Sequence, residues 1–344
     1  MRIAIIMCGQ AIEPGGGVRM QGLMWRDGLS LLGHEIDLVN FWEVYDWKSY
    51  DAIIVLQMVG QFGGILKTIS MNNPNVLFAP ILDPGPSASI RRYRFLAKTM
   101  SKVSECRFGR ILHISSDFIN YYQNKNYAKI FLTRSNQETE YVSKCFDIPV
   151  EKIRQVPLSL RFDPIESFPK KKEDFCFHVS RLSSPNKNVA RLVEAAKKYG
   201  FNLKLAGYLH GDFEKEWMKG LIGDSNNIEY VGALDDSELK DYYRRARVFA
   251  LPSYVEGVGM VAMEAAAYGC EIVLTNLGAP KDYYNGMAEL VNPFSVDEIG
   301  EAVTKCLKEG KSQPALLSFI KDEYSIASCS KKLEAAIIAS TVLI

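Results

Sequence analysis

Residues 248–269 read VFALPSYVEGVGMVAMEAAAYG, a short apolar run followed by a polar turn with glycines and an alanine-rich segment. The spacing predicts a buried strand over 247–251 and a helix over 258–268. Gly257 and Gly259 in the turn allow a close approach between the backbone and a ligand. Free N–H groups and the helix dipole favour an anion at the helix start, most often a phosphate group. The stretch therefore predicts a strand–turn–helix unit with an anion-binding turn.

The same alternation of strand and helix patterns runs along almost the whole chain of 344 residues. Apolar runs of strand length lie at 2–8, 35–40, 51–57, 76–82, 110–115, 129–133 and 153–158, then at 174–180, 201–207, 227–231, 247–251, 271–275 and 288–291. Helical spacing occurs at 18–32, 88–105, 136–146, 186–199, 213–221, 236–246, 258–268, 296–308 and 325–341. Continuous apolar strands that alternate with helices indicate parallel sheets covered on both faces.

Residues 161–173 divide this pattern into two halves, because they hold two prolines and a run of charges without periodicity. Single cores rarely grow beyond about 250–300 residues, so a chain of this length is expected to hold two. We predict an α/β fold of two Rossmann-like, doubly wound parallel-sheet domains, 1–165 and 166–320, that face a central cleft. The helical segment 321–344 is expected to pack back towards the first domain.

Two carboxylates flank the start of the helix in the opening stretch. Glu256 precedes the helix, and Glu264 lies about two turns into it. A carboxylate accepts hydrogen bonds from paired hydroxyls, such as those of a ribose or a hexose, so both suit a polyol beside the anion. The alternative is structural, with Glu256 as a helix cap and Glu264 as a solvated helix residue. Spacing alone does not decide between the two readings.

A second polar loop follows the first strand of the second half, where residues 177–188 read FHVSRLSSPNKN. Arg181 comes at the carboxyl end of that strand, and Lys187 lies near the start of the next helix. Carboxyl ends of parallel strands are the usual ligand-binding edge. Two cations there can bind a diphosphate and stabilise it as a leaving group. The alternative is the ordinary charge of a solvated loop.

Over about residues 174–292 these motifs together resemble the donor-binding domain of the retaining GT-B glycosyltransferases of family 4. The matching pieces are, in chain order, Ser180-Arg181-Leu182, Lys187-Asn188, Val231-Gly232, Pro252-Ser253, the E-x7-E pair Glu256 and Glu264, and residues 269–282. Two positions depart from the family pattern. Val258 replaces the usual aromatic residue between the glycines, and Ala279 replaces the second glycine of a later Gly-Gly pair.

The resemblance implies a role for each matched residue. Arg181 and Lys187 would hold the donor diphosphate and neutralise it as it departs, Glu256 would hold hydroxyls of the transferred sugar, and Glu264 would bind the ribose hydroxyls. The loop after Gly232 would contact the base. The full donor-binding set predicted is Gly16, Gly17, Arg181, Lys187, Gly232, Glu256, Gly257, Val258, Gly259, Met260, Val261 and Glu264.

The first half matches the family less well. Gly15-Gly16-Gly17 follows the first strand, and in the family a glycine-rich loop here reaches the donor diphosphate; Gly16 and Gly17 fit that role best, although a flexible turn is an equal alternative. The loop is not G-x-G-x-x-G, and Val39-Asn40-Phe41 at the end of the second strand lacks the acidic residue that binds ribose. A nicotinamide-dependent oxidoreductase is therefore disfavoured.

Asp83 is the candidate catalytic residue of the first half. The candidate catalytic residues of the second half are Arg181, Lys187 and Glu256. Many family members carry His-Asp after the fourth strand, and Leu82 stands where the histidine would be. We hypothesise that Asp83 contacts the acceptor or the sugar. The alternative is an aspartate that forms the turn before Pro84-Gly85.

Segment 88–105 is amphipathic. Four cations at spacings of 3, 4 and 4 share one face, and four apolar residues share another. The cations are Arg91, Arg94, Lys98 and Lys102, and the apolar residues are Tyr93, Leu96, Met100 and Val103. This arrangement is typical of a solvated helix, but it also suits contact with an anionic membrane or with a pyrophosphate-linked lipid acceptor.

Amino-acid composition narrows the classes of protein to which the chain can belong. The net charge of +1 argues against a dedicated nucleic-acid binder. The 7 cysteines include no C-x-x-C pair, which favours buried free thiols in a reducing compartment. The sequence contains no run of about 18 apolar residues, so it predicts no membrane span. We therefore expect a cytoplasmic protein, with peripheral contact at the inner face of the cell membrane as a further hypothesis.

The family resemblance implies a retaining, metal-independent hexosyltransferase without a cofactor. No Asp-x-Asp pair occurs, so the usual metal–diphosphate ligand of the other main glycosyltransferase fold is missing. By resemblance it would move a sugar from a UDP- or GDP-type donor to a saccharide or lipid-linked acceptor, in bacterial-type surface polysaccharide or glycolipid synthesis. The alternatives are a nucleotide-sugar epimerase of the same fold and a non-catalytic sugar-nucleotide-binding subunit.

Overall fold

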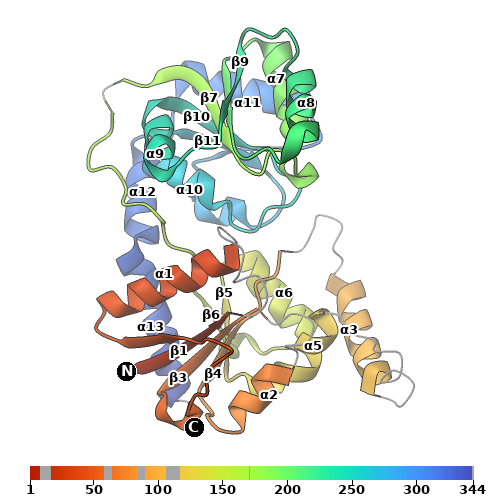
Figure 1. The fold of residues 1–344 in the computed structure, drawn as a ribbon, viewed down its shortest axis with the longest axis vertical. Coiled ribbons are helices and arrows are strands. Elements are labelled where there is room, and N and C mark those ends of the chain that lie inside the picture. The colour runs from red at the N-terminus through yellow and green to blue at the C-terminus, as the bar shows by residue number, and fades with distance from the viewer. Residues whose placement is uncertain (8–16, 58–63, 84–89, 106–116, 170, 343–344) are drawn as a thin grey trace. The chain divides into compact units, whose positions relative to one another are not determined.

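The computed structural model describes residues 1–7, 17–57, 64–83, 90–105, 117–169 and 171–342. The chain separates into two compact units, which are described here one at a time (Figure 1). The first unit comprises Met1–Leu82, Ser87–Ser159 and Ile326–Ile344, and the second comprises Asp83–Pro86 and Leu160–Ser325.

A parallel sheet of six strands forms the centre of the first unit, in the order β2-β1-β3-β4-β5-β6. Its strands are β1 (Arg2–Met7), β2 (Glu35–Leu38), β3 (Ala52–Leu56), β4 (Val76–Ala79), β5 (Ile130–Thr133) and β6 (Ile153–Gln155). Its helices are α1 (Gly17–Leu31), α2 (Ile65–Ser70), α3 (Ile90–Glu105), α5 (Asp117–Asn124), α6 (Asn136–Phe146) and α13 (Ile326–Val342).

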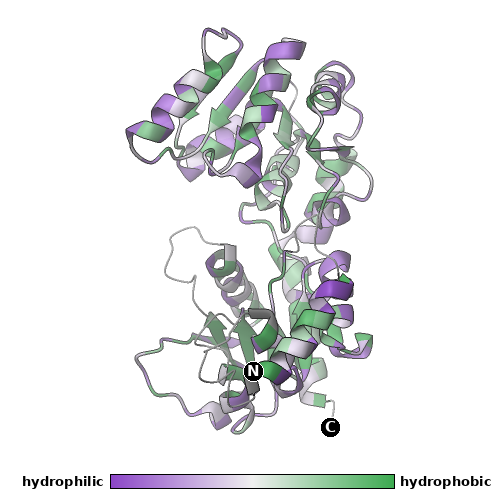
Figure 2. Cartoon of the chain, turned by 90° about the vertical axis from the view of Figure 1, so that its right-hand side faces the viewer, coloured by the Kyte–Doolittle hydropathy of each residue, from purple (hydrophilic) through white to green (hydrophobic). Residues whose placement is uncertain are grey.

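Both faces of this sheet are buried, because successive side chains of each strand point to opposite sides. In β1, Ile3 and Ile5 pack into one apolar cluster, while Ala4 and Ile6 pack into another. The strands are accordingly coloured as hydrophobic in Figure 2, whereas the helices carry both hydrophobic and hydrophilic residues. The continuous apolar runs of the sequence follow from this double burial.

The last helix, α13, belongs to the first unit, although the chain reaches it from the second. It packs against α1, and its Leu333 and Ile337 are buried in the same cluster as Ile3 and Ile5. The His34 ring and the Glu334 carboxylate lie 2.7 Å apart beside this contact. The segment expected as one final helix over 321–344 is thus split at Ser325 between the two units.

The second unit is also built on a parallel sheet of six strands, in the order β12-β11-β10-β7-β8-β9. Its strands are β7 (Glu173–Val179), β8 (Leu203–Ala206), β9 (Ile228–Gly232), β10 (Ala246–Leu251), β11 (Glu271–Thr275) and β12 (Glu289–Val291). Its helices are α7 (Val189–Tyr199), α8 (Gly211–Ile222), α9 (Asp236–Arg245), α10 (Met260–Ala267), α11 (Val296–Glu309) and α12 (Ala315–Tyr324). The α/β fold with two parallel sheets is therefore confirmed.

Three parts of the sequence interpretation differ from the structure or fall outside it. The strand expected over 110–115 lies outside the described residues. The pattern did not predict α2, α5 and α12, which are short. The segment 161–173, interpreted as a linker, instead packs onto the second unit. Its Lys172 is buried there and donates hydrogen bonds to the carbonyls of Tyr243 (2.9 Å) and Tyr268 (2.7 Å), because a charged side chain is buried only with such partners.

Two further findings concern the described part of the chain. None of its helices is both long and apolar enough to pass through a lipid bilayer. Its five cysteines are free and buried; they are Cys145, Cys176, Cys270, Cys306 and Cys329.

Candidate functional site

The strand order of the second unit places a topological switch point between β7 and β10. These adjacent parallel strands lead to helices on opposite sides of the sheet, so their carboxyl ends diverge and leave room for a ligand. The loop after β7 carries Arg181 and Lys187, and the loop after β10 carries Glu256 and Gly257. The structure therefore brings the two predicted donor-binding loops, which are about 70 residues apart in the chain, to one edge of one sheet.

Direct hydrogen bonds join the two loops. The amide of Tyr254 donates to the carbonyl of Asn186 (2.8 Å). The side-chain amide of Asn188 donates to the carbonyls of Pro252 (2.9 Å) and Pro293 (2.7 Å). Asn188 adopts a left-handed backbone conformation with φ of 57°, which asparagine tolerates better than most residues. This residue ends the short 3-10 helix η6 (Pro185–Lys187) and fixes the position of Lys187.

An ion pair lies at the centre of this junction. Lys187 Nζ is 2.7 Å from Glu256 Oε2, and Ser253 Oγ donates to the same oxygen at 3.1 Å. The side chains of Lys187 and Glu256 are 25% and 13% exposed, so solvent and ligands can still reach them. One cation and one carboxylate are therefore held side by side, as a phosphate and a neighbouring hydroxyl group would require.

Helix α10 begins beside this ion pair. Its N-cap is Gly259, with φ of 72° and no side-chain hydrogen bond to the first turn, so the idea that Glu256 caps the helix is wrong. The amides of Ala262 and Met263 both donate to the carbonyl of Gly259. The amides of Met260 and Val261 precede any intrahelical partner and are the donors that an anion at this end would use.

Arg181, the other predicted diphosphate ligand, is exposed at the end of β7. Its charge acts on Glu214 of α8. The pKa of the Glu214 carboxyl is lowered first by a hydrogen bond from the amide of His210, then by Ser183 and by the charges of His210 and Arg181. Arg181 thus has a free solvent face and a nearby carboxylate.

Glu264 is buried and is held by two other side chains of the second unit. Its side chain is only 3% exposed, so the alternative of a solvated helix residue is wrong. Arg161 Nε donates to Glu264 Oε1 at 2.9 Å, and the Tyr243 hydroxyl donates to Oε2 at 3.1 Å. Burial raises the pKa of the Glu264 carboxyl, and the charge of Arg161 opposes that rise. The carboxylate is held by protein donors, and ribose binding by Glu264 stays a prediction.

The remaining predicted donor residues are placed as follows. Gly232 ends β9 with φ of 90°, and its carbonyl accepts a hydrogen bond from the amide of Gly207 (2.9 Å). Val258 is buried. Gly17 is the first residue of α1, and Gly16 lies outside the described residues.

Asp83 is grouped with the second unit. It lies against Gly257, where a β-carbon would come within 2.8 Å of Asp83 Oδ2. Its carboxylate therefore faces the loop that carries Glu256, although nothing in this placement assigns it a chemical role.

The apolar face predicted for helix α3 of the first unit is only partly covered. The four predicted cations are exposed, and Arg94 pairs with Asp147 at 2.6 Å. Leu96, one of the four residues predicted on the apolar face, is 49% exposed, and its neighbour Phe95 is 67% exposed. Ala97 is buried. The buried face follows the four-residue step from Tyr93 to Ala97, and this step turns Phe95 and Leu96 outward.

Two residues of the site were missed by sequence reasoning. Arg161 stands in a proline-containing charged segment, and Tyr243 sits in a helix chosen for its pattern alone, so neither carried a motif. Their only sequence signal was their type, since an arginine and a tyrosine are frequent partners of a buried carboxylate.

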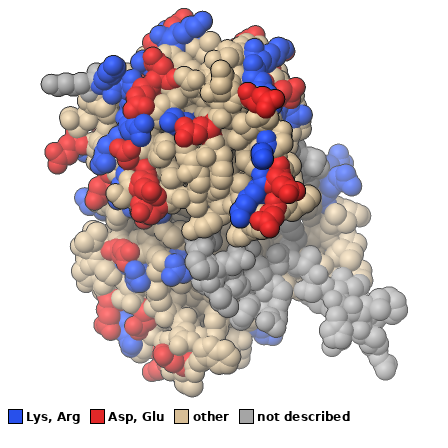
Figure 3. Space-filling view, turned by 45° about the horizontal axis from the view of Figure 1, so that its top comes forward, with Lys and Arg blue, Asp and Glu red and all other residues tan. Residues whose placement is uncertain are grey.

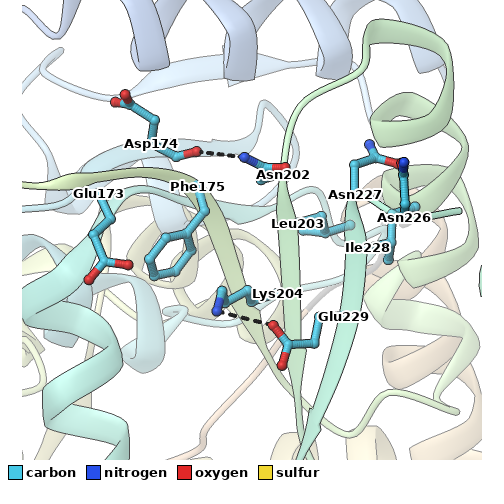
Figure 4. A pocket seen from close by; sticks show the side chains of 10 residues that line it. All are labelled: Glu173, Asp174, Phe175, Asn202, Leu203, Lys204, Asn226, Asn227, Ile228 and Glu229. Carbon is cyan, nitrogen blue, oxygen red and sulfur yellow. Dashed lines mark hydrogen bonds and ion pairs between the residues drawn. The ribbon is translucent and has the colours of Figure 1, made fainter.

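A cavity of about 300 Å³ lies at the opposite edge of the second sheet, at the amino ends of β7, β8 and β9 (Figure 4). Lys204 and Glu229 pair across it at 3.1 Å. We do not assign the donor to it, because the predicted donor loops leave the carboxyl ends of β7 and β10. Within the described residues, no group of three or more His, Cys, Asp or Glu side chains is arranged to hold a metal ion.

Acidic and basic side chains are interspersed over the face shown in Figure 3. Among the described residues visible there, opposite charges lie next to each other and no broad surface of one sign forms. Any anion bound on this face would therefore depend on a few individual cations and not on bulk charge.

Known proteins resemble this chain in sequence and in fold. Residues 161–320 match the family model described as "Glycosyl transferases group 1". The O-antigen chain mannosyltransferase B of Escherichia coli is 24% identical over 200 residues, which cover 53% of this chain and 52% of that protein. The chain thus spans about half the length of this curated relative.

Solved structures share the fold across both units. Sucrose-phosphate synthase of Thermosynechococcus elongatus has a TM-score of 0.71 at 16% identity, covering 98% of this chain and 99% of that chain. TarM of S. aureus, solved in a complex that includes UDP, has a TM-score of 0.60 at 15% identity, covering 84% of this chain and 56% of that chain. At these identities the likeness concerns the fold alone.

Proposed function

Because the chain belongs to the glycosyl transferases group 1 family and has a GT-B fold, we propose that it transfers a hexose from a UDP- or GDP-type sugar to an acceptor. The observation that carries this proposal is the Lys187–Glu256 ion pair, held between two hydrogen-bonded loops at the switch point of β7 and β10. The cation suits the donor diphosphate, and the carboxylate suits the hydroxyls of the transferred sugar.

The proposed reaction retains the anomeric configuration, as the family resemblance implies. The bond between the anomeric carbon and the leaving phosphate oxygen breaks, and the acceptor oxygen bonds to the same face of that carbon. The leaving phosphate oxygen takes the acceptor proton, so no protein base is required where Leu82 replaces the usual histidine. Arg181, Lys187 and the start of α10 stabilise the charge that develops on the diphosphate. Asp83 is the polar group proposed to contact the acceptor.

The test is the release of nucleoside diphosphate from UDP- and GDP-hexoses, with and without saccharide or polyprenyl-diphosphate-linked saccharide acceptors. A transferase releases it in step with acceptor glycosylation. An epimerase converts the donor without an acceptor, and a non-catalytic subunit binds the donor without turnover. Either of these last two results would contradict the proposal.

Site variants test the donor assignment. We expect Lys187→Ala and Glu256→Ala each to lower kcat/KM at least about tenfold, since hydrogen bonds to charged groups contribute roughly 1.5–3 kcal/mol. Lys204→Ala and Glu229→Ala are matched controls, because they break a similar ion pair at the opposite sheet edge and should keep full activity. Full activity in both site variants would show that the donor lies elsewhere.

The acceptor side of the proposal is a saccharide or lipid-linked saccharide, reached at an anionic membrane surface through α3. The E. coli relative is named for an O-antigen chain, which supports a role in surface polysaccharide synthesis. Arg91, Arg92, Phe95 and Leu96 line an exposed hollow on this helix, so cations and apolar side chains lie together as at a membrane interface.

Vesicle co-sedimentation tests this contact. Binding should rise with the phosphatidylglycerol content of phosphatidylcholine vesicles, because the cations of α3 attract anionic lipids. Replacing Phe95 and Leu96 by serine should weaken it at least about tenfold, since burying one such side chain contributes roughly 1.5–3 kcal/mol. Leu31→Ser, which changes another exposed leucine of the first unit, is the control. Binding that ignored lipid charge would remove the membrane from the proposal.

A further inference from the structure

Arg161, near the start of the second unit, holds the buried carboxylate of Glu264. Besides the contact of Arg161 Nε with Oε1, Arg161 Nη2 lies 3.5 Å from Oε2, so the guanidinium addresses both carboxylate oxygens. Its third nitrogen, Nη1, donates to Asp236 Oδ1 at 2.8 Å. The guanidinium therefore makes a fork to Glu264 and a tether to α9, a geometry that lysine cannot reproduce.

Arg161 is itself held in place. Its guanidinium carbon lies 3.9 Å from the centre of the Phe162 ring. The chain just before it is fixed by a hydrogen bond from the amide of Leu160 to the carbonyl of Tyr324 (2.8 Å). The arginine thus combines contacts to a ring, a backbone anchor and two carboxylates, which restricts the positions that it can offer to Glu264.

We propose that Arg161 is a positioning residue of the donor site, which keeps the Glu264 carboxylate ionised and oriented to accept the hydroxyls of the nucleotide ribose. The inference rests on the proposed function, because it takes Glu264 as the ribose ligand. A carboxylate has about four acceptor positions; the guanidinium takes up to two of them and the Tyr243 hydroxyl takes one, which leaves at least one for a ribose hydroxyl.

Burial would otherwise favour protonation of this carboxylate. A charge removed from water without a partner is costly, and a buried carboxyl group avoids that cost by binding a proton. A protonated carboxyl accepts hydrogen bonds far less well, so a ribose diol would lose its acceptor. Besides Arg161 and Tyr243, the titratable groups that act on Glu264 are Asp236 of α9, Tyr268 after α10 and Tyr284. Among these groups, all from the described residues, the cation is Arg161.

The experiment measures the Kd of UDP and GDP by calorimetry from pH 6 to pH 8.5, for the full-length wild type and for Arg161→Gln. Neutral glutamine lets Glu264 take up a proton, so we expect Kd to rise about tenfold or more near pH 6.5 and by less at pH 8.5, where the carboxylate ionises again. Arg161→Lys keeps the charge without the fork and should lie between the two. The pH dependence of Kd for the wild type is the reference, because it includes the effect of ionisation of the nucleotide phosphates.

Arg245→Gln is the matched control, since Arg245, at the opposite end of α9 from Asp236, makes a similar two-point contact with Glu173 at 2.7 and 3.2 Å. In a Glu264→Gln background, Arg161→Gln should cause no further loss of affinity. This double-variant comparison keeps the test valid if the single change also lowers stability, because a merely structural role would add to the loss.

The outcomes separate the two proposals. If the wild type bound neither nucleotide, the proposed function would fail and this inference with it. Wild-type binding that Arg161→Gln left unchanged, or weakened equally at every pH, would overturn the inference alone. Tighter binding by Arg161→Gln would also overturn it, because Arg161 would then compete with the ribose for Glu264.

Discussion

His178 offers a quantitative prediction about acid stability. It lies near the end of β7 with its ring fully buried. Nδ1 is 2.8 Å from the carbonyl oxygen of Ala250, and Nε2 is 2.7 Å from Ser180 Oγ. Because a carbonyl oxygen can only accept, Nδ1 carries the proton and Nε2 accepts from the serine hydroxyl. The neutral ring thus joins β7 to β10 directly beneath the loop that carries Arg181.

The size of the effect follows from the pKa of this ring. Burial lowers the pKa of His178 from 6.5 to about 4. The unfolded chain therefore binds the proton first, so stability is present above pH 6.5 and is lost as the pH falls towards 4. At about 1.36 kcal/mol per unit, the full term is roughly 3 kcal/mol, of which about 2.5 kcal/mol is lost between pH 7 and pH 4.5.

Urea unfolding at several pH values measures this loss. The chain has 4 tryptophans, and replacing Trp25, Trp42 and Trp47 by phenylalanine leaves Trp217 on α8 as a fluorescent reporter of the second unit. In that background we compare His178 with His178→Gln, which cannot titrate. Other titrating groups contribute equally to both proteins, so only the difference in pH dependence is interpreted. Equal losses of stability between pH 7 and pH 4.5 would refute the assignment of a buried neutral histidine.

Two further changes test local features of the second unit with the same reporter. Lys172→Met should lower stability by about 2 kcal/mol, because it removes the ammonium donor from the carbonyls of Tyr243 and Tyr268 and leaves Tyr243 with the weak thiol donor of Cys270 (3.2 Å). The exposed neighbour Lys171→Met is its control, and equal effects would contradict the reasoning. Gly259→Ala should cost about 1–2 kcal/mol and weaken nucleotide binding, because φ of 72° disfavours a β-carbon at the start of α10. Gly220→Ala, inside α8 with open space around it, should instead be neutral or stabilising.

Much of the fold could be predicted because its information is local. Strands buried on both faces must be apolar throughout, and all twelve strands of the described residues fall within or beside predicted runs. The helices α2, α5 and α12 were missed; α2 and α5, with 6 and 8 residues, offer little periodicity to detect, whereas α12 has 10 residues and this reason does not cover it. The exposure of Leu96 on α3 was left open by the sequence, because an amphipathic pattern does not record what covers its apolar face.

The sequence by itself determined two parallel α/β sheets and the motif residues of the proposed donor site, because strand burial, glycine turns and the E-x7-E spacing are properties of neighbouring residues. Only the tertiary structure decided which side chains contact the residues of those motifs. It joined Lys187 to Glu256, covered Glu264 with Arg161 and Tyr243, and returned α13 to the first unit. These pairings link residues about 20 to 300 positions apart, and no local pattern records a contact that depends on how strands are ordered within a sheet.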